Sequence, residues 1–388
     1  MKLLFILNIA NRLNSFSYSS MLAAKQLGID FQIAGNWGYS SEDEKKEDEK
    51  RHGIRIHQID FYRNPFHPGN IKAFRQLGSL MERERYNAVH CNTPVGGLLG
   101  RICAKQRRVN TVIYSAHGFH FYKGAEFFNR TVIKFTEIIL ARWTDAIITM
   151  NEEDSQAARK FYLRNAGKVY KTHGVGIDTD QYINVTANRE NYCKDLRIHP
   201  ESIIMISVGD LIERKGYEVS IQAMENIKKF NVCLLICGEG PMQSKLKALC
   251  RQLDLEKQVR FLGFRNDIKE LLSISDVFIL SSKQEGLPRS LMEAMASGLP
   301  CIVSGIRGNV DLLEDGKGGF LCEPNNQLMF SESMMKLFDS ELRQRMGKAN
   351  IRRISEFSMN RVIEEMVEIY CDEFNMPKQI TARQSIRP

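Results

Sequence analysis

The chain has 388 residues, which is too long for one ordinary hydrophobic core and fits two domains. Apolar residues make up 43% and charged residues 26% of it, as in soluble globular proteins, so a disordered or fibrous chain is excluded. The formal net charge is +8, but no nucleic-acid recognition motif accompanies it, so we expect no nucleic-acid partner.

Short apolar runs alternate with helix-like stretches along the whole chain, and continuous β-branched runs of this kind predict parallel sheets covered on both faces. In the first half, strands are predicted at 2–9, 30–35, 54–60, 86–92, 111–117 and 145–151. In the second half, they are predicted at 203–210, 232–240, 259–264, 276–282 and 300–306. We therefore predict an α/β fold with two doubly wound parallel-sheet domains facing across a cleft.

A polar stretch at about 178–200 separates the two series of strands, and we interpret it as the connection between the domains. The N-terminal domain is expected over 1–185 and the C-terminal domain over 195–365. Residues 366–388 are predicted to form a C-terminal helix and tail that could pack back on the N-terminal domain.

Targeting segments and cysteines favour a cytoplasmic chain. The start, MKLLFILNIANRL, lacks a small-residue cleavage site, so a buried first strand is favoured over a signal peptide. No window reaches the roughly 18 uncharged apolar residues that a spanning helix needs. The nine cysteines have no pairing rhythm, which predicts reduced thiols, and Cys233 and Cys237 are interpreted as core residues rather than metal ligands.

The excess of basic over acidic residues is confined to the N-terminal half. Residues 1–190 hold 27 Lys and Arg against 19 Asp and Glu, whereas the remainder is neutral. The segments FHFYKGAEFFNR (119–130) and RICAKQRRVN (101–110) combine aromatic and basic residues, which suits a surface that meets anionic lipid. We therefore consider peripheral binding to the inner face of the cell membrane, although a solvated basic face would explain the charge equally well.

Ligands of open parallel sheets bind outside the carboxyl ends of the strands, and several motifs stand there. Arg214 and Lys215 follow one strand and precede a helix expected near Gly216 to Tyr217. Two fixed cations there suit a diphosphate, although they could also be solvated loop residues. Gly209, Gly238 and Gly263 end three strands and would let backbone approach a nucleobase, but each glycine alone is a weak signal.

The stretch KQEGLPRSLMEAMASG (283–298) places two carboxylates around a predicted turn. Glu285 lies in the loop, Pro288 fits the first turn of the next helix, and Glu293 falls on its second turn. The free amides at about 289–291 favour an anion between the carboxylates, as in a nucleotide sugar. Glu285 could instead be a cap or surface charge, whereas Glu293 would need exposure or a ligand.

The E-x7-E arrangement of Glu285 and Glu293 within EGLPRSLMEAMASGLPCIVS resembles the signature of retaining glycosyltransferases of family 4, which have the GT-B fold of two Rossmann-like domains. VGDLIERKG is similar to that family's phosphate-binding segment, and SGIRGNVDLLEDGKGGFLCEP to its next glycine-rich loop and acidic residue. HCNTPVGGLLGRICAKQ and YSAHGFHFYKGAEFFNR resemble members that build capsular and exopolysaccharides on lipid-linked acceptors.

The resemblance implies roles for individual residues. Arg214 and Lys215 would bind the donor diphosphate, Glu293 the ribose and Glu285 the hydroxyls of the transferred sugar. Catalytic roles would fall to His117, Glu285 and Lys215, with His117 near the sugar and the acceptor; a core histidine is the alternative for His117. The implied donor-binding residues are Gly209, Arg214, Lys215, Gly238, Gly263, Glu285, Leu287, Pro288, Ser290 and Glu293, while Asp311 would only orient its loop.

The implied reaction transfers a hexose or N-acetylhexosamine, with retention, from a nucleotide-diphosphate sugar, with uridine as the base, to a hydroxyl of a lipid-linked saccharide. The departing phosphate would act as the base. No Asp-x-Asp ends a strand in the C-terminal half, so no metal and no other cofactor is expected. One departure is the first loop, LNIANRLNSFSYS, which lacks the family's glycines, so its contribution would come from Asn8, Asn11 or nearby amides.

Other functions fit the same residues. A nucleotide-sugar epimerase of the same fold would change the sugar without an acceptor, and a non-catalytic binder would hold the donor without turnover. A dehydrogenase is disfavoured because no G-x-G-x-x-G follows the first strand.

Overall fold

The computed structural model describes residues 1–10, 12–13 and 15–377. The chain divides into two compact units, residues 1–176 with 359–388 (unit 1) and residues 177–358 (unit 2). The polar stretch at 178–200, interpreted from the sequence as a connection, carries α7 (Asp180–Ile183) and α8 (Arg189–Leu196). Tyr182 on α7 and Cys193 on α8 are buried in the core of unit 2, so this stretch belongs to that unit.

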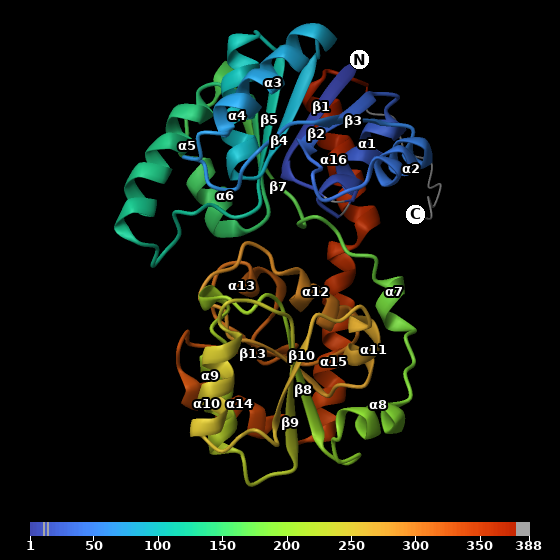
Figure 1. The fold of residues 1–388 in the computed structure, drawn as a ribbon, viewed down its shortest axis with the longest axis vertical. Helices are drawn as coiled ribbons and strands as arrows, with labels where there is room; N and C mark the ends of the chain where they lie inside the picture. Colours follow the sequence, from blue (N-terminus) through green and yellow to red (C-terminus); the bar gives the residue numbers. More distant parts are fainter. Residues whose placement is uncertain (11, 14, 378–388) are drawn as a thin grey trace. The chain divides into compact units, whose positions relative to one another are not determined.

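Unit 1 is a seven-stranded parallel sheet in the order β3-β2-β1-β4-β5-β6-β7 (Figure 1). Its strands are β1 (Lys2–Ile9), β2 (Asp30–Asn36), β3 (Arg55–Gln58), β4 (Ala88–Asn92), β5 (Thr111–Ala116), β6 (Ala146–Thr149) and β7 (Lys168–Lys171). Its helices are α1 (Ser15–Gln26), α2 (Glu42–His52), α3 (Asn70–Glu84), α4 (Pro94–Gln106), α5 (Lys134–Ala141), α6 (Glu152–Ala158) and α16 (Met359–Glu373), with a π-helical turn η1 (Asn129–Ile133) and a 3₁₀ turn η2 (Arg164–Ala166).

Unit 2 is a six-stranded parallel sheet in the order β10-β9-β8-β11-β12-β13. Its strands are β8 (Ile203–Val208), β9 (Val232–Cys237), β10 (Val259–Gly263), β11 (Val277–Leu280), β12 (Cys301–Ser304) and β13 (Gly319–Cys322). Besides α7 and α8 it has α9 (Tyr217–Asn226), α10 (Gln243–Gln252), α11 (Ile268–Ser273), α12 (Arg289–Ala296), α13 (Asn309–Leu312), α14 (Gln327–Lys336) and α15 (Ser340–Ile354), and the 3₁₀ turns η3 (Glu213–Lys215) and η4 (Ser355–Phe357).

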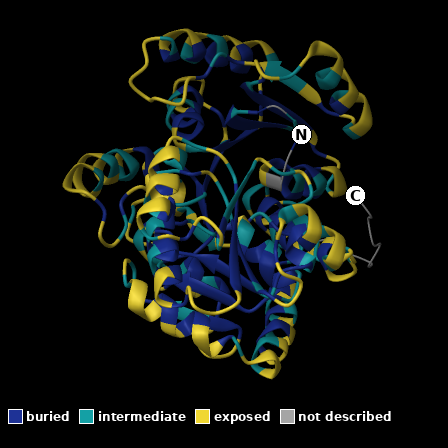
Figure 2. Ribbon diagram, turned by 60° about the horizontal axis from the view of Figure 1, so that its bottom comes forward, coloured by how far each residue is buried: buried dark blue, intermediate teal, exposed yellow. Residues whose placement is uncertain are grey.

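The central strands of each sheet are buried on both faces, which is why they are mostly apolar, whereas the edge strands β3 and β7 carry exposed polar residues at both ends (Figure 2). In β1, Leu3 and Phe5 pack into one core while Leu4 and Ile6 pack into the other. Helix α16 covers the first of these faces, and its Tyr370 hydroxyl lies 2.8 Å from Nδ1 of the buried His90. The C-terminal helix is therefore part of the core of unit 1; residues 378–388, the predicted tail, lie outside the described residues.

The strand order reverses between β1 and β4 in unit 1 and between β8 and β11 in unit 2. The connections on either side of such a point leave toward opposite faces of the sheet and open a crevice at the carboxyl ends of the strands. The predicted fold, two doubly wound parallel sheets, is confirmed, and each predicted strand is present. Within the described part of the chain, no helix combines the length and apolar character needed to cross a bilayer.

Candidate active site

The loops after β8 and β11 meet at the reversal point of unit 2. The first contains η3 and ends at Gly216, which has a φ of +62° before α9 begins at Tyr217. A Cβ at Gly216 would lie 2.3 Å from the carbonyl oxygen of Ser281, so only glycine allows this approach. The Ser281 hydroxyl donates to the Gly216 carbonyl at 2.8 Å, which ties the two loops together.

A buried ion pair joins these loops. Lys215 Nζ lies 2.8 Å from Glu285 Oε1, and the two side chains are only 10% and 7% exposed. The Ser282 hydroxyl donates to the same oxygen at 2.7 Å, and Arg214 Nη1 lies 3.3 Å from Oε2. A carboxylate buried in this way is stable only because several donors replace water. The predicted diphosphate ligands and the predicted sugar ligand are thus held in one cluster.

Arg307, which the sequence analysis did not single out, supports this cluster from the loop after β12. Its buried guanidinium donates from Nε to the Glu285 carbonyl at 3.0 Å. A Cβ at Gly308 would lie 2.3 Å from the Gly286 carbonyl oxygen, so the two loops are in contact. The Asp311 carboxylate accepts a hydrogen bond from the Gly308 amide at 3.0 Å, as expected of a residue that orients its loop. The one sequence feature that could have predicted this role is the position of Arg307 just after a strand, where ligand-binding loops begin.

Glycines end the neighbouring strands. Gly238 has a φ of +142°, and a Cβ there would lie 2.1 Å from the Gly209 carbonyl oxygen. The Gly238 amide donates to the Gly263 carbonyl at 2.8 Å, and the Tyr217 hydroxyl donates to the Gly209 carbonyl at 2.8 Å. The three predicted glycines therefore lie on adjacent strand ends, and Gly238 is required there because its backbone approaches that of Gly209 so closely.

Helix α12 begins at Arg289, so Pro288 precedes the helix instead of lying in its first turn as predicted. Its extended backbone (φ −74°, ψ 117°) places it at the N-cap, where its carbonyl accepts from the Met292 amide at 3.2 Å. None of the described side chains caps the first turn, which includes Ser290. The first amides and the positive end of the helix dipole therefore favour an anion. Leu287 packs against the apolar core beside this turn.

Glu293 is not exposed, so exposure, the first of the two options drawn from the sequence, is wrong, and the second option, a ligand, stays a prediction. Its side chain is 15% exposed, and Oε1 accepts a hydrogen bond from Arg289 Nε at 2.8 Å, one helical turn away. Burial and the neighbouring Glu293 carboxylate raise the pKa of Tyr182. A ligand that reaches Glu293 would have to share it with Arg289.

His117 follows β5 in unit 1, close to the reversal point of that sheet. Its Nε2 lies 3.1 Å from Asn92 Oδ1, and its ring packs edge-on against Phe16 with centroids 4.8 Å apart. Burial lowers the pKa of His117 to about 4, so the ring is neutral at pH 7 and Nε2 donates to Asn92. Asn8, on β1, is buried and its Oδ1 has no hydrogen-bond partner among the described residues, whereas Asn11 lies outside them.

The aromatic and basic segments of unit 1 match the predicted surface only in part: their cations are exposed except for Arg101, whereas the first two aromatic residues are buried. Phe119 and Phe121 are buried and stack on each other with ring centroids 4.6 Å apart. Arg101 is fully buried, 2.8 Å from Glu137 and with its guanidinium over the Tyr114 ring. These residues are core because α4 and the loop after β5 pack against the sheet. The exposed apolar side chains come later, at Phe127, Phe128, Val132, Phe135 and Ile139.

No group of three His, Cys, Asp or Glu side chains able to hold a metal occurs in the ranges that the structure describes. The nine cysteines are all buried and free, and Cys233 and Cys237 lie in one core cluster, as predicted.

Comparison with known proteins identifies the family. Residues 188–353 match the model of the glycosyl transferases group 1, and residues 17–170 match that of the glycosyl transferase 4-like domain. The putative glycosyltransferase EpsD of Bacillus subtilis (strain 168) is 32% identical over 381 residues, which cover 97% of both chains. The chain belongs to the group 1 glycosyltransferases. The resemblance stated from the sequence is thereby confirmed.

Other relatives of this glycosyltransferase have more specific names. An Escherichia coli protein, "UDP-Gal:alpha-D-GlcNAc-diphosphoundecaprenol alpha-1,3-galactosyltransferase", is 30% identical over 310 residues, 78% of this chain and 80% of its own. Among solved structures, Anabaena Alr3699/HepE in complex with UDP matches with a TM-score of 0.78 at 18% identity, covering 96% of this chain and 100% of that one. The sucrose-phosphate synthase of Thermosynechococcus elongatus matches with a TM-score of 0.81 at 18% identity, covering 97% and 100%. These structures establish the GT-B fold.

Proposed function

We propose that this glycosyltransferase moves a hexose or N-acetylhexosamine from a UDP-sugar, with retention, to a hydroxyl of a lipid-linked saccharide during cell-surface polysaccharide synthesis. The observation that carries the donor half is the cluster of Lys215, Arg214 and Glu285 at the reversal point of unit 2, beside the uncapped start of α12. A site with two cations and free amides suits a diphosphate.

In this proposal the donor diphosphate lies against Lys215, Arg214 and the first amides of α12. These groups are fixed before the donor arrives, so they stabilise the negative charge that develops on the leaving diphosphate. Glu285 accepts hydrogen bonds from hydroxyls of the transferred sugar, and Glu293 accepts them from the ribose. The departing phosphate takes the proton of the acceptor hydroxyl, and no metal or other cofactor takes part. His117 contacts the sugar or positions the acceptor.

The choice of donor and acceptor rests on the relatives. HepE has been crystallised with UDP and with UDP-glucose, and the E. coli relative is named for a UDP-sugar donor and a diphosphoundecaprenol-linked acceptor. The Salmonella typhimurium relative named for colanic acid biosynthesis, WcaL, supports a cell-surface polysaccharide as the product.

A lipid-linked acceptor requires contact with the inner face of the membrane, and α5 offers a surface for it. Phe128, Val132, Phe135 and Ile139 are exposed at spacings of four, three and four, which places them along one side of η1 and α5. Exposed Lys123, Arg130 and Lys134 accompany them. Because α5 leads from the carboxyl end of β5 to the amino end of β6, this apolar stripe starts at the sheet edge that carries His117. A basic amphipathic surface suits anionic lipid.

The transfer reaction is tested with purified protein, a panel of UDP-sugars and a synthetic polyprenyl-diphosphate saccharide, in EDTA. We expect one UDP-sugar to give an extended lipid-linked product whose new linkage has the anomeric configuration of the donor. A new sugar nucleotide formed without acceptor, or donor binding without any product, would contradict the proposal.

Membrane contact is tested by flotation with vesicles of phosphatidylcholine alone or mixed with phosphatidylglycerol. We expect recovery with the anionic vesicles and its loss in Phe128→Ser/Phe135→Ser. Equal recovery with both vesicles would rule out an electrostatic contribution.

A further inference from the structure

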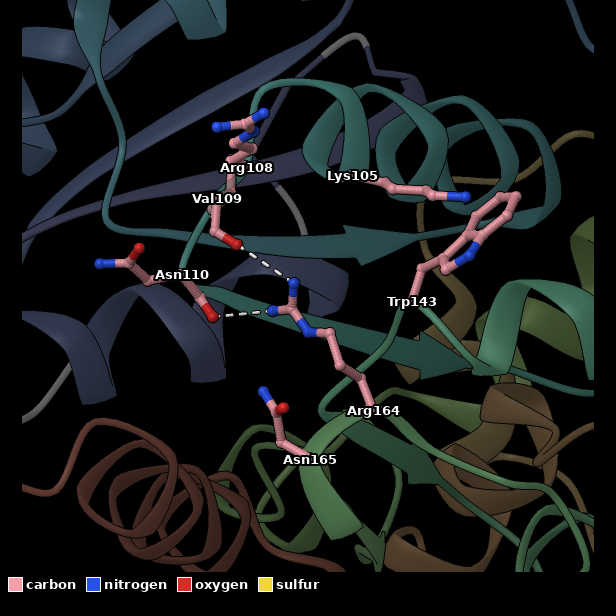
Figure 3. Close-up of a pocket in the computed structure, with 7 residues that line it drawn as sticks. All are labelled: Lys105, Arg108, Val109, Asn110, Trp143, Arg164 and Asn165. Carbon is pink, nitrogen blue, oxygen red and sulfur yellow. Dashed lines mark hydrogen bonds between the residues drawn. The ribbon is translucent and has the colours of Figure 1, made fainter.

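A second basic feature of unit 1 lies at the far end of α5, away from the candidate active site. It is a cavity of about 320 Å³ lined by Lys105, Arg108, Val109, Asn110, Trp143, Arg164 and Asn165 (Figure 3). These residues end α4 and α5 and precede β5, β6 and β7, so the cavity lies at the amino edge of the sheet. His117 stands at the opposite, carboxyl edge, so the cavity is separate from the reaction site.

One of the three cations in this cavity is used internally. Arg164 Nε donates to Asp145 Oδ1 at 2.8 Å, and its other nitrogens donate to the Asn110 carbonyl at 2.7 Å and the Val109 carbonyl at 3.3 Å. Figure 3 shows the guanidinium turned toward those two carbonyls. Arg164 therefore holds the cavity's shape, and its charge is balanced by Asp145.

The other two cations are open to solvent. Lys105 and Arg108 are exposed, and neither forms an ion pair with a carboxylate in the described ranges. Arg107, which lies between them in sequence, is paired differently: its Nη2 lies 3.5 Å from Glu82 on α3, outside the cavity. The cavity thus presents two uncompensated positive charges.

An indole ring completes the cavity. Lys105 Nζ lies 3.7 Å from the centre of the Trp143 ring. Figure 3 shows the lysine side chain reaching toward this indole. Basic residues at the end of α4 also complement its dipole, but that role needs no aromatic partner. Trp143 is half-buried and follows Ile139 by four residues, so it continues the spacing of the exposed stripe on α5. Indole rings beside cations are typical of the membrane–water interface.

We infer that this cavity binds the phosphate of an anionic phospholipid, with Lys105 and Arg108 against the phosphate and Trp143 at the level of the headgroups. The inference rests on the proposed membrane contact of α5 and extends it. The apolar stripe would enter the headgroup region, and the cavity would fix the end of the helix that lies far from the reaction edge.

The experiment uses intrinsic fluorescence of the full chain. It has two tryptophans, of which Trp37 is buried and Trp143 lines the cavity. Vesicles of phosphatidylcholine with phosphatidylglycerol should change the emission, and the change should be absent in Trp143→Phe. Lys105→Gln and Arg108→Gln should each weaken binding about fivefold. Arg107→Gln, a matched loss of charge next to the cavity, should have a smaller effect.

Equal weakening by Arg107→Gln and Arg108→Gln would show diffuse attraction and overturn the inference. The same emission change with inorganic phosphate alone would assign the cavity to free phosphate instead of lipid. UDP titration of the Lys105→Gln and Arg108→Gln variants separates this inference from the proposed function. It should match the wild type, whatever the vesicles show.

Discussion

Lys215 Nζ lies 2.8 Å from Glu285 Oε1, although 70 residues separate them in the chain. The contact exists because β8 and β11 are neighbours at the point where the strand order reverses, so the loops that follow them meet. Each charge is buried and depends on the other. The cation is therefore held in place before any donor arrives, which is what stabilisation of a leaving diphosphate requires.

Replacing Lys215 tests this arrangement directly. Lys215→Met should lower kcat/KM for the UDP-sugar by roughly 10²- to 10³-fold, about 2.7–4 kcal/mol, since a fixed charge at the leaving group is lost. The matched control is Lys283→Met. Lys283 is exposed in the neighbouring loop and lies 3.8 Å from Glu213, so near-normal steady-state kinetics are expected. Near-normal turnover by Lys215→Met would show that Lys215 does not stabilise the leaving diphosphate.

Glu293 offers a second kinetic test, because its hydrogen-bond partner on α12, Arg289, can be removed separately. Glu293→Ala should lower kcat/KM by roughly 10²- to 10³-fold through loss of a charge-assisted bond to the donor. Arg289→Gln, which removes the internal partner and leaves the carboxylate, should cost far less. Equal losses would indicate that the ion pair acts only to stabilise α12, a result that circular dichroism of both variants would check.

The close approach of Gly238 to Gly209 makes a steric prediction. Gly238→Ala should abolish UDP binding, because its Cβ would lie 2.1 Å from the Gly209 carbonyl oxygen and the strand ends would have to separate. Gly316 is the control: it also has a positive φ, +72°, but nothing lies within 4 Å of its added Cβ. Gly316→Ala should cost only the backbone strain of about 1–2 kcal/mol and keep UDP affinity. Unchanged calorimetry for Gly238→Ala would contradict the assignment.

Two histidines of unit 1, the buried His90 and the partly buried His117, predict a pH dependence of stability. The pKa of His117 falls from 6.5 to about 4 on folding, and that of His90 to about 3, because burial disfavours the charged ring. Below pH 6.5 the unfolded state takes up these protons first, so the unfolding free energy falls as pH drops from 6.5 toward 4.

In His117→Asn, the fall in unfolding free energy between pH 6.5 and pH 4 should be smaller than in the wild type by on the order of 3 kcal/mol. Urea unfolding followed by tryptophan fluorescence measures it, because Trp37 and Trp143 both belong to unit 1. A variant that loses as much stability as the wild type between these pH values would show that His117 is not the group responsible.

The sequence predicted the parallel sheets because buried strands are continuous apolar runs, but it missed β7 and β13. Both are edge strands of four residues, and β7 begins and ends with lysine, so neither shows such a run. The contact between Lys215 and Glu285 follows from the order of the strands in the sheet, and one amino-acid sequence alone does not give that order. Phe119 and Phe121 appeared suited to a surface because aromatic residues serve cores and interfaces alike; only their burial decides.

Binding of a nucleoside diphosphate by Lys215 and Arg214, without metal, is the basis of the proposed function. Calorimetric titration with UDP, GDP and ADP in EDTA tests it most directly, with Lys215→Met beside the wild type. We expect micromolar binding of UDP by the wild type and a loss of binding in Lys215→Met. Binding that requires added Mg²⁺, or equal UDP affinity in the two proteins, would contradict it.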